Sequence, residues 1–400
     1  MKKIIYLAYI LIISGSVSGQ QTVDYILQSR ALKESGKPDI AQELLTKAIG
    51  DKKESRLYTE RAEIYIIKGN YTAAISDYNE ANMITPSSGE YGLSKVYALK
   101  GDAATSLYHL EINLNSSFKK SEKEILLDPA FGTLENKPEW RQFWKKDRYS
   151  ITENGLSEIT YYISVGKIDE AKTVLSELKK ESQGNNEIIY AEAMINLASG
   201  KYSEVIKLIS GLLSIYPDDE KYLRILARAQ TGASNPAGAS VTYTQLLNIG
   251  IADAELLILR ADCYRKTGET DKALTDIEKY LDYYPENKAV LSLAGKVESA
   301  AGDNIKALEY FSNNLKLHPN DAECYIDRAN AYFVSKSWNW AIKDFSMSLD
   351  LNPGNSDAWL NMGIALLNSG KTEDACHNFN ESFRLGNKRA SEYISRNCIK

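Results

Sequence analysis

The stretch LILRADCYRKTGETDKALTDIEKYLDYYP, residues 257–285, decides the fold. It contains two segments with apolar residues at helical spacing, separated by Gly268, which can end a helix in the left-handed conformation. Ala273 follows that glycine by five residues, and Ile277 lies four residues further on. A small residue suits the point where two helices come closest, and a large one fills the space beside it. Pro285 cannot extend the second helix. The stretch therefore predicts an antiparallel helical hairpin.

The same pattern recurs at a regular interval along nearly the whole chain. Glycines end an apolar helical segment at Gly36, Gly69, Gly101, Gly166, Gly200, Gly268, Gly302 and Gly370. From Gly166 onward the interval is constant, as from Gly166 to Gly200 and from Gly268 to Gly302, provided that Ser234 and Lys336 take the two remaining turn positions. A single hairpin cannot bury both of its faces, so neighbouring hairpins must stack. The repeat thus predicts an all-α solenoid.

This pattern resembles the tetratricopeptide repeat (TPR) family. The resemblance rests on the turn glycine, the small residue after it, the aromatic or large apolar residue and the closing proline, and it covers nearly the whole chain. It implies an α-solenoid of about ten TPR hairpins that form a right-handed superhelix with a capping helix at the C-terminus. For function it implies a generic scaffold that binds other proteins.

The repeats divide the chain into segments. Residues 20–115 are expected to form a block of three repeats and residues 151–386 a block of seven. Residues 116–150 break the period and read as a helical insert, while residues 387–400 read as the capping helix. The insert's aromatic residues Trp140, Phe143 and Trp144 either pack against the flanking repeats or form an exposed patch. Trp338 and Trp340 read as turn packing, with Trp340 partly exposed.

Residues 1–19 have the pattern of a cleavable export signal. Lys2 and Lys3 precede an apolar run, which ends in small residues up to Gly19. Cleavage there leaves Gln20 at the new terminus. The run is far shorter than the ~20 residues that a membrane span needs. We expect export to the periplasm, with secretion or surface association as alternatives. The C-terminal run EDACHNFNESFRLGNKRASEYISRNC is similar to the ending of exported TPR proteins of the Bacteroidota.

A disulfide is expected between Cys376 and Cys398. The two cysteines lie equally far from Asn387 along the chain, one on each side. Two antiparallel helices are predicted to join there, so the turn brings the two cysteines level. Packed helices can place facing Cα atoms within the ~4.4–6.8 Å that a disulfide requires. The alternative is two buried thiols. Cys263 and Cys324, two repeats apart, have no comparable geometry.

The composition argues against several classes of function. A net charge of −5 without a basic block is poorly suited to binding nucleic acid, because phosphate contacts supply most of that affinity. The three histidines lie in different repeats, and the four cysteines form no Cys-x-x-Cys motif, so no metal site is expected. No catalytic constellation is recognisable either. The sequence therefore indicates a protein that is not an enzyme and has no cofactor.

The concave groove of the solenoid is the candidate binding site, because the first helix of each hairpin lines it. The residues expected there are Tyr190, Met194, Arg224, Arg228, Asp262, Arg265, Lys296, Asp327, Asn330 and Asn361. Two hypotheses remain open. The first is a scaffold that binds proteins or peptides of an envelope assembly. The alternative is a periplasmic module whose groove holds a glycan or peptidoglycan fragment through the chain's many tyrosines.

Overall fold

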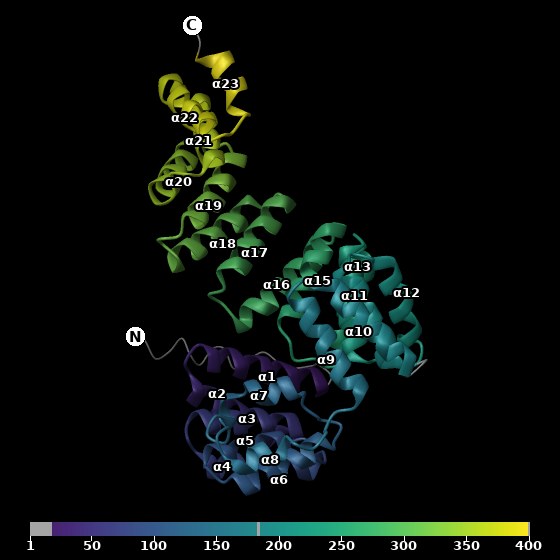
Figure 1. Ribbon diagram of the computed structural model, residues 1–400. Coiled ribbons are helices and arrows are strands. Elements are labelled where there is room, and N and C mark those ends of the chain that lie inside the picture. The colour runs from purple at the N-terminus through teal and green to yellow at the C-terminus, as the bar shows by residue number, and fades with distance from the viewer. Residues whose placement is uncertain (1–17, 182–184, 399–400) are drawn as a thin grey trace. The chain divides into compact units, whose positions relative to one another are not determined.

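The computed structural model describes residues 18–181 and 185–398 (Figure 1). Every regular element within these two ranges is a helix, and they contain no strand. The all-α fold predicted from the repeat period is confirmed. Residues 1–17 of the expected export signal lie outside the described residues. None of the described helices is long and apolar enough to cross a membrane.

The chain forms two compact units, Met1–Leu256 (unit 1) and Leu257–Lys400 (unit 2). Unit 1 contains six hairpins, three before a short insert and three after it. The hairpins before the insert are α1 (Ser18–Glu34) with α2 (Pro38–Asp51), α3 (Ser55–Ile67) with α4 (Tyr71–Ile84), and α5 (Glu90–Leu99) with α6 (Ala103–Leu114). Those after it are α9 (Ile151–Ser164) with α10 (Ile168–Glu181), α11 (Asn186–Ala198) with α12 (Tyr202–Leu213), and α13 (Glu220–Gly232) with α14 (Pro236–Asn248).

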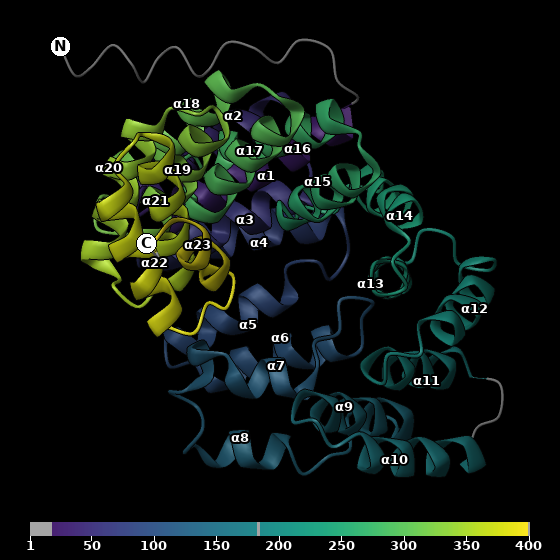
Figure 2. The same cartoon turned by 90° about the horizontal axis from the view of Figure 1, so that it is seen from above.

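Unit 2 contains four hairpins and a terminal helix. They are α15 (Glu255–Thr267) with α16 (Thr270–Tyr283), α17 (Lys288–Ala301) with α18 (Asn304–Leu317), α19 (Ala322–Val334) with α20 (Trp338–Leu351), α21 (Ser356–Asn368) with α22 (Thr372–Arg384), and α23 (Ala390–Asn397). Figure 2 shows α19 to α22 packed side by side, as expected of stacked hairpins. Each hairpin buries its apolar stripe against its neighbours, so the core runs along the stack.

The turns explain why the period is regular. All eight predicted turn glycines have a positive φ, between 70° and 90°. The two turn positions without glycine do the same, with φ of 55° at Ser234 and 57° at Lys336. Residues other than glycine seldom adopt this backbone conformation, because their Cβ atom crowds the following carbonyl oxygen. The hairpin geometry therefore imposes the turn on Ser234 and Lys336 despite its local cost.

The small residues after the turns lie where the two helices of a hairpin meet. Ala273 and Ala307 are completely buried, and so is Ile277, while Phe311 is 2% exposed. Their side chains belong to clusters that join one hairpin to the next. The contact leaves no room for a larger residue at the alanine positions, because protein interiors are close-packed.

The insert continues the core of unit 1. It contains α7 (Glu122–Leu127), a short 3-10 helix (Pro129–Phe131) and α8 (Pro138–Phe143). Trp140 and Phe143 are buried with Leu110 and Leu114 of α6, and Trp144 is partly buried beside them. The aromatic residues of the insert thus pack against the preceding repeat. The insert packs on α5 and α6, and the boundary between the two compact units lies further along the chain, at residues 256 and 257.

Helix α23 closes the C-terminal end of the described stack. Tyr393 stacks on Phe379 of α22 with ring centroids 5.0 Å apart, and Ala390 is fully buried. The structure contains the disulfide between Cys376 and Cys398, whose Cα atoms are 5.6 Å apart. Cys263 and Cys324 are buried and take no part in a disulfide.

Candidate functional site

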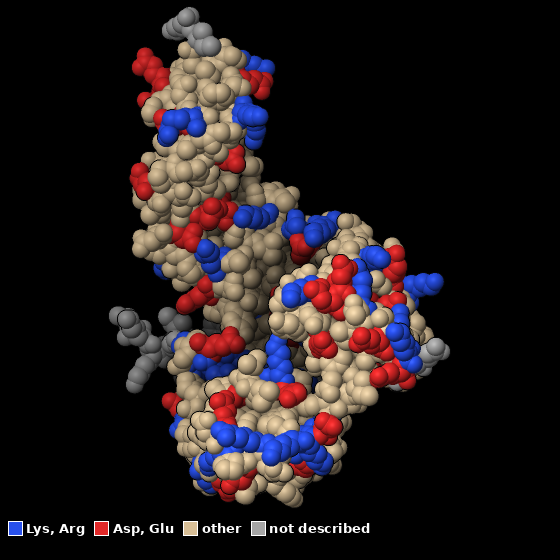
Figure 3. Space-filling model, viewed as in Figure 1, with Lys and Arg blue, Asp and Glu red and all other residues tan. Residues whose placement is uncertain are grey.

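The first helices of the hairpins in unit 2 carry polar side chains that the sequence places in a binding groove. Lys296, Asp327, Asn330 and Asn361, together with Ser292, come from α17, α19 and α21 and are called the first-helix face below. Helix α17 lies against α19, and a hydrogen bond links α19 to α21, so side chains one repeat apart are neighbours. On the side of unit 2 visible in Figure 3, acidic and basic side chains are interspersed among large uncharged areas.

Asp327 is the most buried member of the first-helix face. Its side chain is only 9% exposed, yet it carries a carboxylate. Lys296 Nζ lies 2.9 Å from one carboxylate oxygen, and the Ser292 hydroxyl donates to the other. A buried carboxylate needs such partners, because leaving it unpaired costs several kcal/mol. Lys296 remains largely exposed beyond this contact. The sequence predicted both Lys296 and Asp327 here, but not that they pair with each other.

Asn330 and Asn361 form a second pair on the same face. Asn361 Nδ2 donates to Asn330 Oδ1 over 3.5 Å, at the long limit for a hydrogen bond. Both side chains are half-buried. The pair keeps most of its hydrogen-bonding capacity, since each amide has two N–H donors and an acceptor oxygen. The structure therefore places these two predicted residues side by side.

Asp262 and Arg265 pair within α15. Arg265 donates to Asp262 Oδ1 at 2.7 Å, and Lys266 Nζ lies 2.7 Å from Oδ2. Burial acts to raise the pKa of Asp262, but the hydrogen bonds from Lys266 and Arg265 outweigh it, so the pKa lies below the usual value. No contact joins these residues to the first-helix face in the described part of unit 2. They form a local ion cluster.

The remaining four predicted residues belong to unit 1. Tyr190 and Met194 on α11 are half-buried, and burial raises the pKa of Tyr190. Arg224 on α13 bonds to Glu220 at 2.8 Å and Asp253 at 2.9 Å, which fixes its guanidinium. Arg228 is exposed and has no ion-pair partner among the described residues. The four residues thus share a unit, but no contact between described side chains joins all of them into one site.

The tyrosines have a structural role that the sequence did not predict. Tyr65, Tyr264 and Tyr332 each lie beneath an arginine one helical turn earlier, Arg61, Arg260 or Arg328, at 5.7–5.9 Å from the ring centroid. Each arginine also makes two hydrogen bonds to a buried aspartate 16 residues later, namely Asp77, Asp276 or Asp344. The fixed spacing between arginine and aspartate was the signal available in the sequence.

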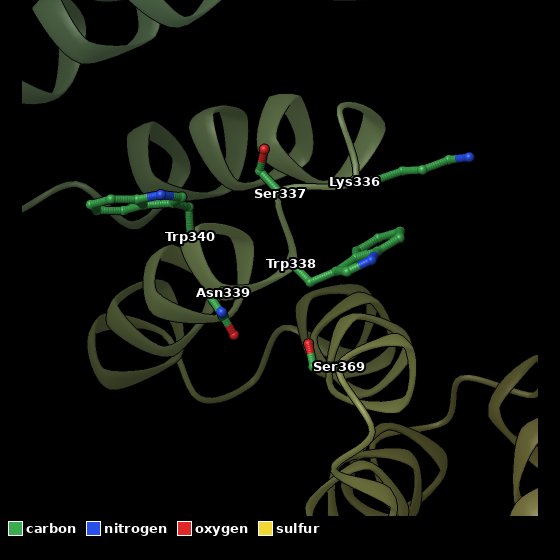
Figure 4. A pocket seen from close by; sticks show the side chains of 6 residues that line it. All are labelled: Lys336, Ser337, Trp338, Asn339, Trp340 and Ser369. Carbon is green, nitrogen blue, oxygen red and sulfur yellow. The ribbon is translucent and has the colours of Figure 1, made fainter.

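Unit 2 also has a small open pocket that the sequence did not predict. It has a volume of 390 Å³ and lies at the turn between α19 and α20 (Figure 4). Its lining residues are Lys336, Ser337, Trp338, Asn339, Trp340 and, from the next hairpin, Ser369. Trp340 is 58% exposed, in keeping with its expected position at the turn. Within the described residues, no group of three or more His, Cys, Asp or Glu side chains could hold a metal ion.

Three segments of the chain match family models described as tetratricopeptide repeat, at residues 26–88, 255–287 and 345–377. Among curated proteins, DnaJ homolog subfamily C member 3 of Gallus gallus is 26% identical over 160 residues, which are 40% of this chain and 28% of that protein. Tetratricopeptide repeat protein 13 of Homo sapiens is 24% identical over 54% of this chain and 22% of its own length. The chain thus spans less than a third of either relative.

Solved structures show the same kind of likeness. A tetratricopeptide repeat protein from Parabacteroides merdae is 19% identical, with a TM-score of 0.46, over 61% of this chain and 98% of that one. YrrB, described as a TPR protein with an unusual peptide-binding site, is 17% identical, with a TM-score of 0.38, over 47% of this chain and 97% of its own.

The segments that match the family models lie in both compact units. Between them, the hairpins keep the same turn geometry, the same buried small residue and the same stacking. The chain is a tetratricopeptide repeat protein.

Proposed function

We propose that this protein is a non-catalytic scaffold of the cell envelope that binds an extended peptide segment of a partner protein on the first-helix face of unit 2. The partner segment lies across α17, α19 and α21. The proposal rests on one observation above all: Asn330 and Asn361 stand side by side on neighbouring first helices with most of their hydrogen-bonding capacity unused.

An asparagine amide matches a peptide group. Each can donate and accept a hydrogen bond at the same time, so an asparagine can hold a peptide backbone without regard to its side chains. Consecutive asparagines on adjacent helices can therefore grip an extended chain at successive points. The long bond between Asn361 and Asn330 is readily exchanged for shorter bonds to such a ligand.

The neighbouring charges favour a ligand with mixed polarity. Lys296 offers an exposed ammonium group, but Asp327 beneath it neutralises much of its charge. Leu259, 38% exposed on α15, adds apolar surface on the same series of first helices. A peptide with both apolar and polar side chains suits this surface better than a strongly charged polymer does.

The envelope location is part of the proposal. It is supported by the signal-like pattern of residues 1–19 and by the disulfide between Cys376 and Cys398. Disulfides persist in exported proteins and are rare where the cytosol keeps thiols reduced. An envelope scaffold would meet its partners in that oxidising compartment.

The groove-bound glycan alternative has less support. It relied on the many tyrosines, but Tyr65, Tyr264 and Tyr332 lie beneath arginines of their own hairpins. Tyr190 packs on Tyr222, with ring centroids 5.7 Å apart. These rings help to hold the hairpins together, and no described tyrosine is a member of the first-helix face.

The test is a selection of displayed random peptides on the full chain, followed by affinity measurements with labelled copies of the selected peptides. Replacing both Asn330 and Asn361 with alanine should weaken binding by about tenfold or more, because two hydrogen-bonding groups are lost. Asn380→Ala, on the exposed second helix α22, is the matched control and should bind normally. Equal binding by the double variant, or failure to select any peptide, would refute the proposed site.

A further inference from the structure

The pocket at the α19–α20 turn has a construction of its own, separate from the first-helix face. Five of its six lining residues are consecutive, from Lys336 to Trp340, and the sixth, Ser369, ends helix α21 of the next hairpin. Figure 4 shows the Trp338 indole and the Lys336 side chain extending on the same side of the turn, with Trp340 on the other side. The pocket is open to solvent and has a volume of 390 Å³.

The two indoles are held in place before any ligand arrives. Trp340 stacks on Tyr332 with ring centroids 6.0 Å apart and an interplanar angle of 26°. Tyr332 in turn lies beneath Arg328, which Asp344 anchors. Trp338 meets Phe333 edge-on at 5.3 Å. Trp340 is 58% exposed, but its ring stacks on Tyr332, and the Lys343 ammonium lies 5.7 Å from its centroid. Trp338 is therefore the indole that lies on the same side of the turn as Lys336 (Figure 4).

Lys336 is unusual because it occupies a turn position where eight of the ten hairpins have glycine. Its φ of 57° is left-handed, which costs roughly 1–2 kcal/mol for a residue with a Cβ atom. Ser234 adopts the same conformation at the equivalent turn, so the hairpin geometry imposes it on both residues. The exposed Lys336 side chain has no acidic partner among the described residues, and its positive charge lies on the same side of the turn as the Trp338 indole (Figure 4).

The remaining lining residues supply neutral hydrogen-bonding groups. The Asn339 side chain is exposed, and its amide offers two donors and an acceptor. The Ser369 hydroxyl donates to the Ala365 carbonyl at 2.8 Å, which leaves its lone pairs free to accept. The pocket therefore combines flat aromatic surface, neutral polar groups and one cation.

We propose that this pocket binds a saccharide that carries a carboxylate group. A sugar ring has an apolar face of C–H groups, which stacks on an indole, and a rim of hydroxyl groups, which suits Asn339 and Ser369. The carboxylate accounts for Lys336, because a charge-assisted hydrogen bond is stronger than a neutral one. This site is independent of the peptide-binding function proposed above, since it involves none of the first-helix residues.

The test uses two acidic probes, trigalacturonate and the disaccharide of N-acetylglucosamine and N-acetylmuramic acid. Their neutral counterparts are the trimethyl ester of the first and chitobiose. Binding to the full chain is followed by calorimetry and by tryptophan fluorescence. At least one acidic probe should bind, and its neutral counterpart should bind at least about tenfold more weakly, because one charge-assisted bond is lost. Added salt should weaken binding of the acidic probe.

The variant Lys336→Gly separates binding from folding. It removes the ammonium group but relieves the backbone strain, so the protein should become more stable while losing about tenfold or more in affinity. Ser234→Gly makes the same backbone change in unit 1 and should leave affinity unchanged. Trp338→Ala, on the same side of the turn as Lys336 (Figure 4), should weaken binding and reduce the fluorescence change.

Three outcomes would overturn the proposal: no binding of either acidic probe, equal binding of the neutral counterparts, or wild-type affinity in Lys336→Gly. If the peptides selected on the first-helix face instead perturb Trp338 and compete there, the pocket belongs to the peptide site and the saccharide proposal fails. Peptide binding that leaves Trp338 unaffected keeps the two sites distinct.

Discussion

The guanidinium of Arg328 on α19 and the carboxylate of Asp344 on α20 are joined by two hydrogen bonds of 2.7 and 2.9 Å. The Asp344 side chain is 3% exposed and that of Arg328 is 22% exposed, so the pair lies largely within the hairpin. Equivalent pairs join Arg61 to Asp77 and Arg260 to Asp276. The bridge thus fixes the two helices of a hairpin at one point in three separate repeats.

Removing the carboxylate should destabilise unit 2. Asp344→Ala leaves the Arg328 guanidinium partly buried without its partner, and we expect a loss of about 3 kcal/mol or more. Asp350→Ala, at an exposed position on the same helix, is the control and should change stability by less than ~0.5 kcal/mol. Urea unfolding followed by circular dichroism measures both. Equal stability of the two variants would show that the bridge contributes nothing net.

Substitutions at the left-handed turns should change stability in opposite directions, depending on whether glycine is introduced or removed. Ser234→Gly should stabilise the protein by about 1 kcal/mol, because it relieves the strain of a positive φ. Gly302→Ala, at φ 90°, should destabilise it by a similar amount. Gly354→Ala is the control, since its φ is not left-handed and its Cβ would make only an ordinary contact, 3.6 Å from the Asn352 side chain. In thermal unfolding, the melting temperature should be highest for Ser234→Gly, close to that of the unmodified protein for Gly354→Ala, and lowest for Gly302→Ala. A raised melting temperature in Gly302→Ala would contradict the turn assignment.

Overpacking at the closest helix contact should open a hairpin. Ala307→Leu places three more carbon atoms at a fully buried position and should cost about 1–3 kcal/mol. Ala273→Leu is expected to behave alike. Ala301→Leu, on the exposed end of α17, is the control and should have little effect. Unchanged melting temperatures in the two buried variants would mean that the alanines do not lie at the closest contact.

The disulfide should be detectable and should stabilise the C-terminal end. A non-reduced digest should yield one linked peptide pair that contains Cys376 and Cys398. Replacing both with serine should cost about 2–4 kcal/mol, because the bond closes a 22-residue separation in the unfolded chain. Hydrogen exchange should then increase in α23 more than in α19. Separate peptides with free thiols at both positions would rule the bond out.

Acid should weaken the contact between α17 and the loop before α19. The Lys288 ammonium donates a hydrogen bond to Asp321, which lowers the pKa of Asp321 below its usual 3.8. Because the folded-state pKa is the lower one, this contact stabilises the protein above pH 3.8 and is lost as the pH falls through the folded-state pKa.

Unfolding measured from about pH 6 down to pH 2 should therefore show falling stability below pH 4. Asp321→Asn removes the titrating group and should flatten that part of the profile. Asp350→Asn, at an exposed position with no ion-pair partner in the described residues, should leave it unchanged. A profile for Asp321→Asn identical to that of the unmodified protein would show that the contact does not contribute.

Much of the fold could be predicted because its determinants are local and periodic. The helix lengths, the turn positions and the buried alanines all recur from one repeat to the next. That register was regular enough to assign turn positions to Ser234 and Lys336, where the structure shows a left-handed conformation that neither residue favours. The disulfide between Cys376 and Cys398 could likewise be predicted, because both cysteines lie equally far from the turn of a single hairpin.

The candidate site depended on tertiary contacts that the period does not encode. Periodicity places a residue on a helix face, but it does not say which side chain from another helix comes within hydrogen-bonding distance. For this reason the sequence grouped Arg224, Asp262 and Asp327 with Asn330 and Asn361. The structure engages the first three in ion pairs and leaves the two amides with unused capacity.

The sequence by itself determined the helical hairpins, their register and their stacking, because each hairpin needs only its own turn and its nearest neighbours to bury its apolar surface. Only the tertiary structure decided that the aromatic residues of the insert are buried, and that Ser369 completes a pocket with residues of the preceding hairpin. These features require side chains from different helices to meet at distances of a few ångströms, and small differences in packing set those distances.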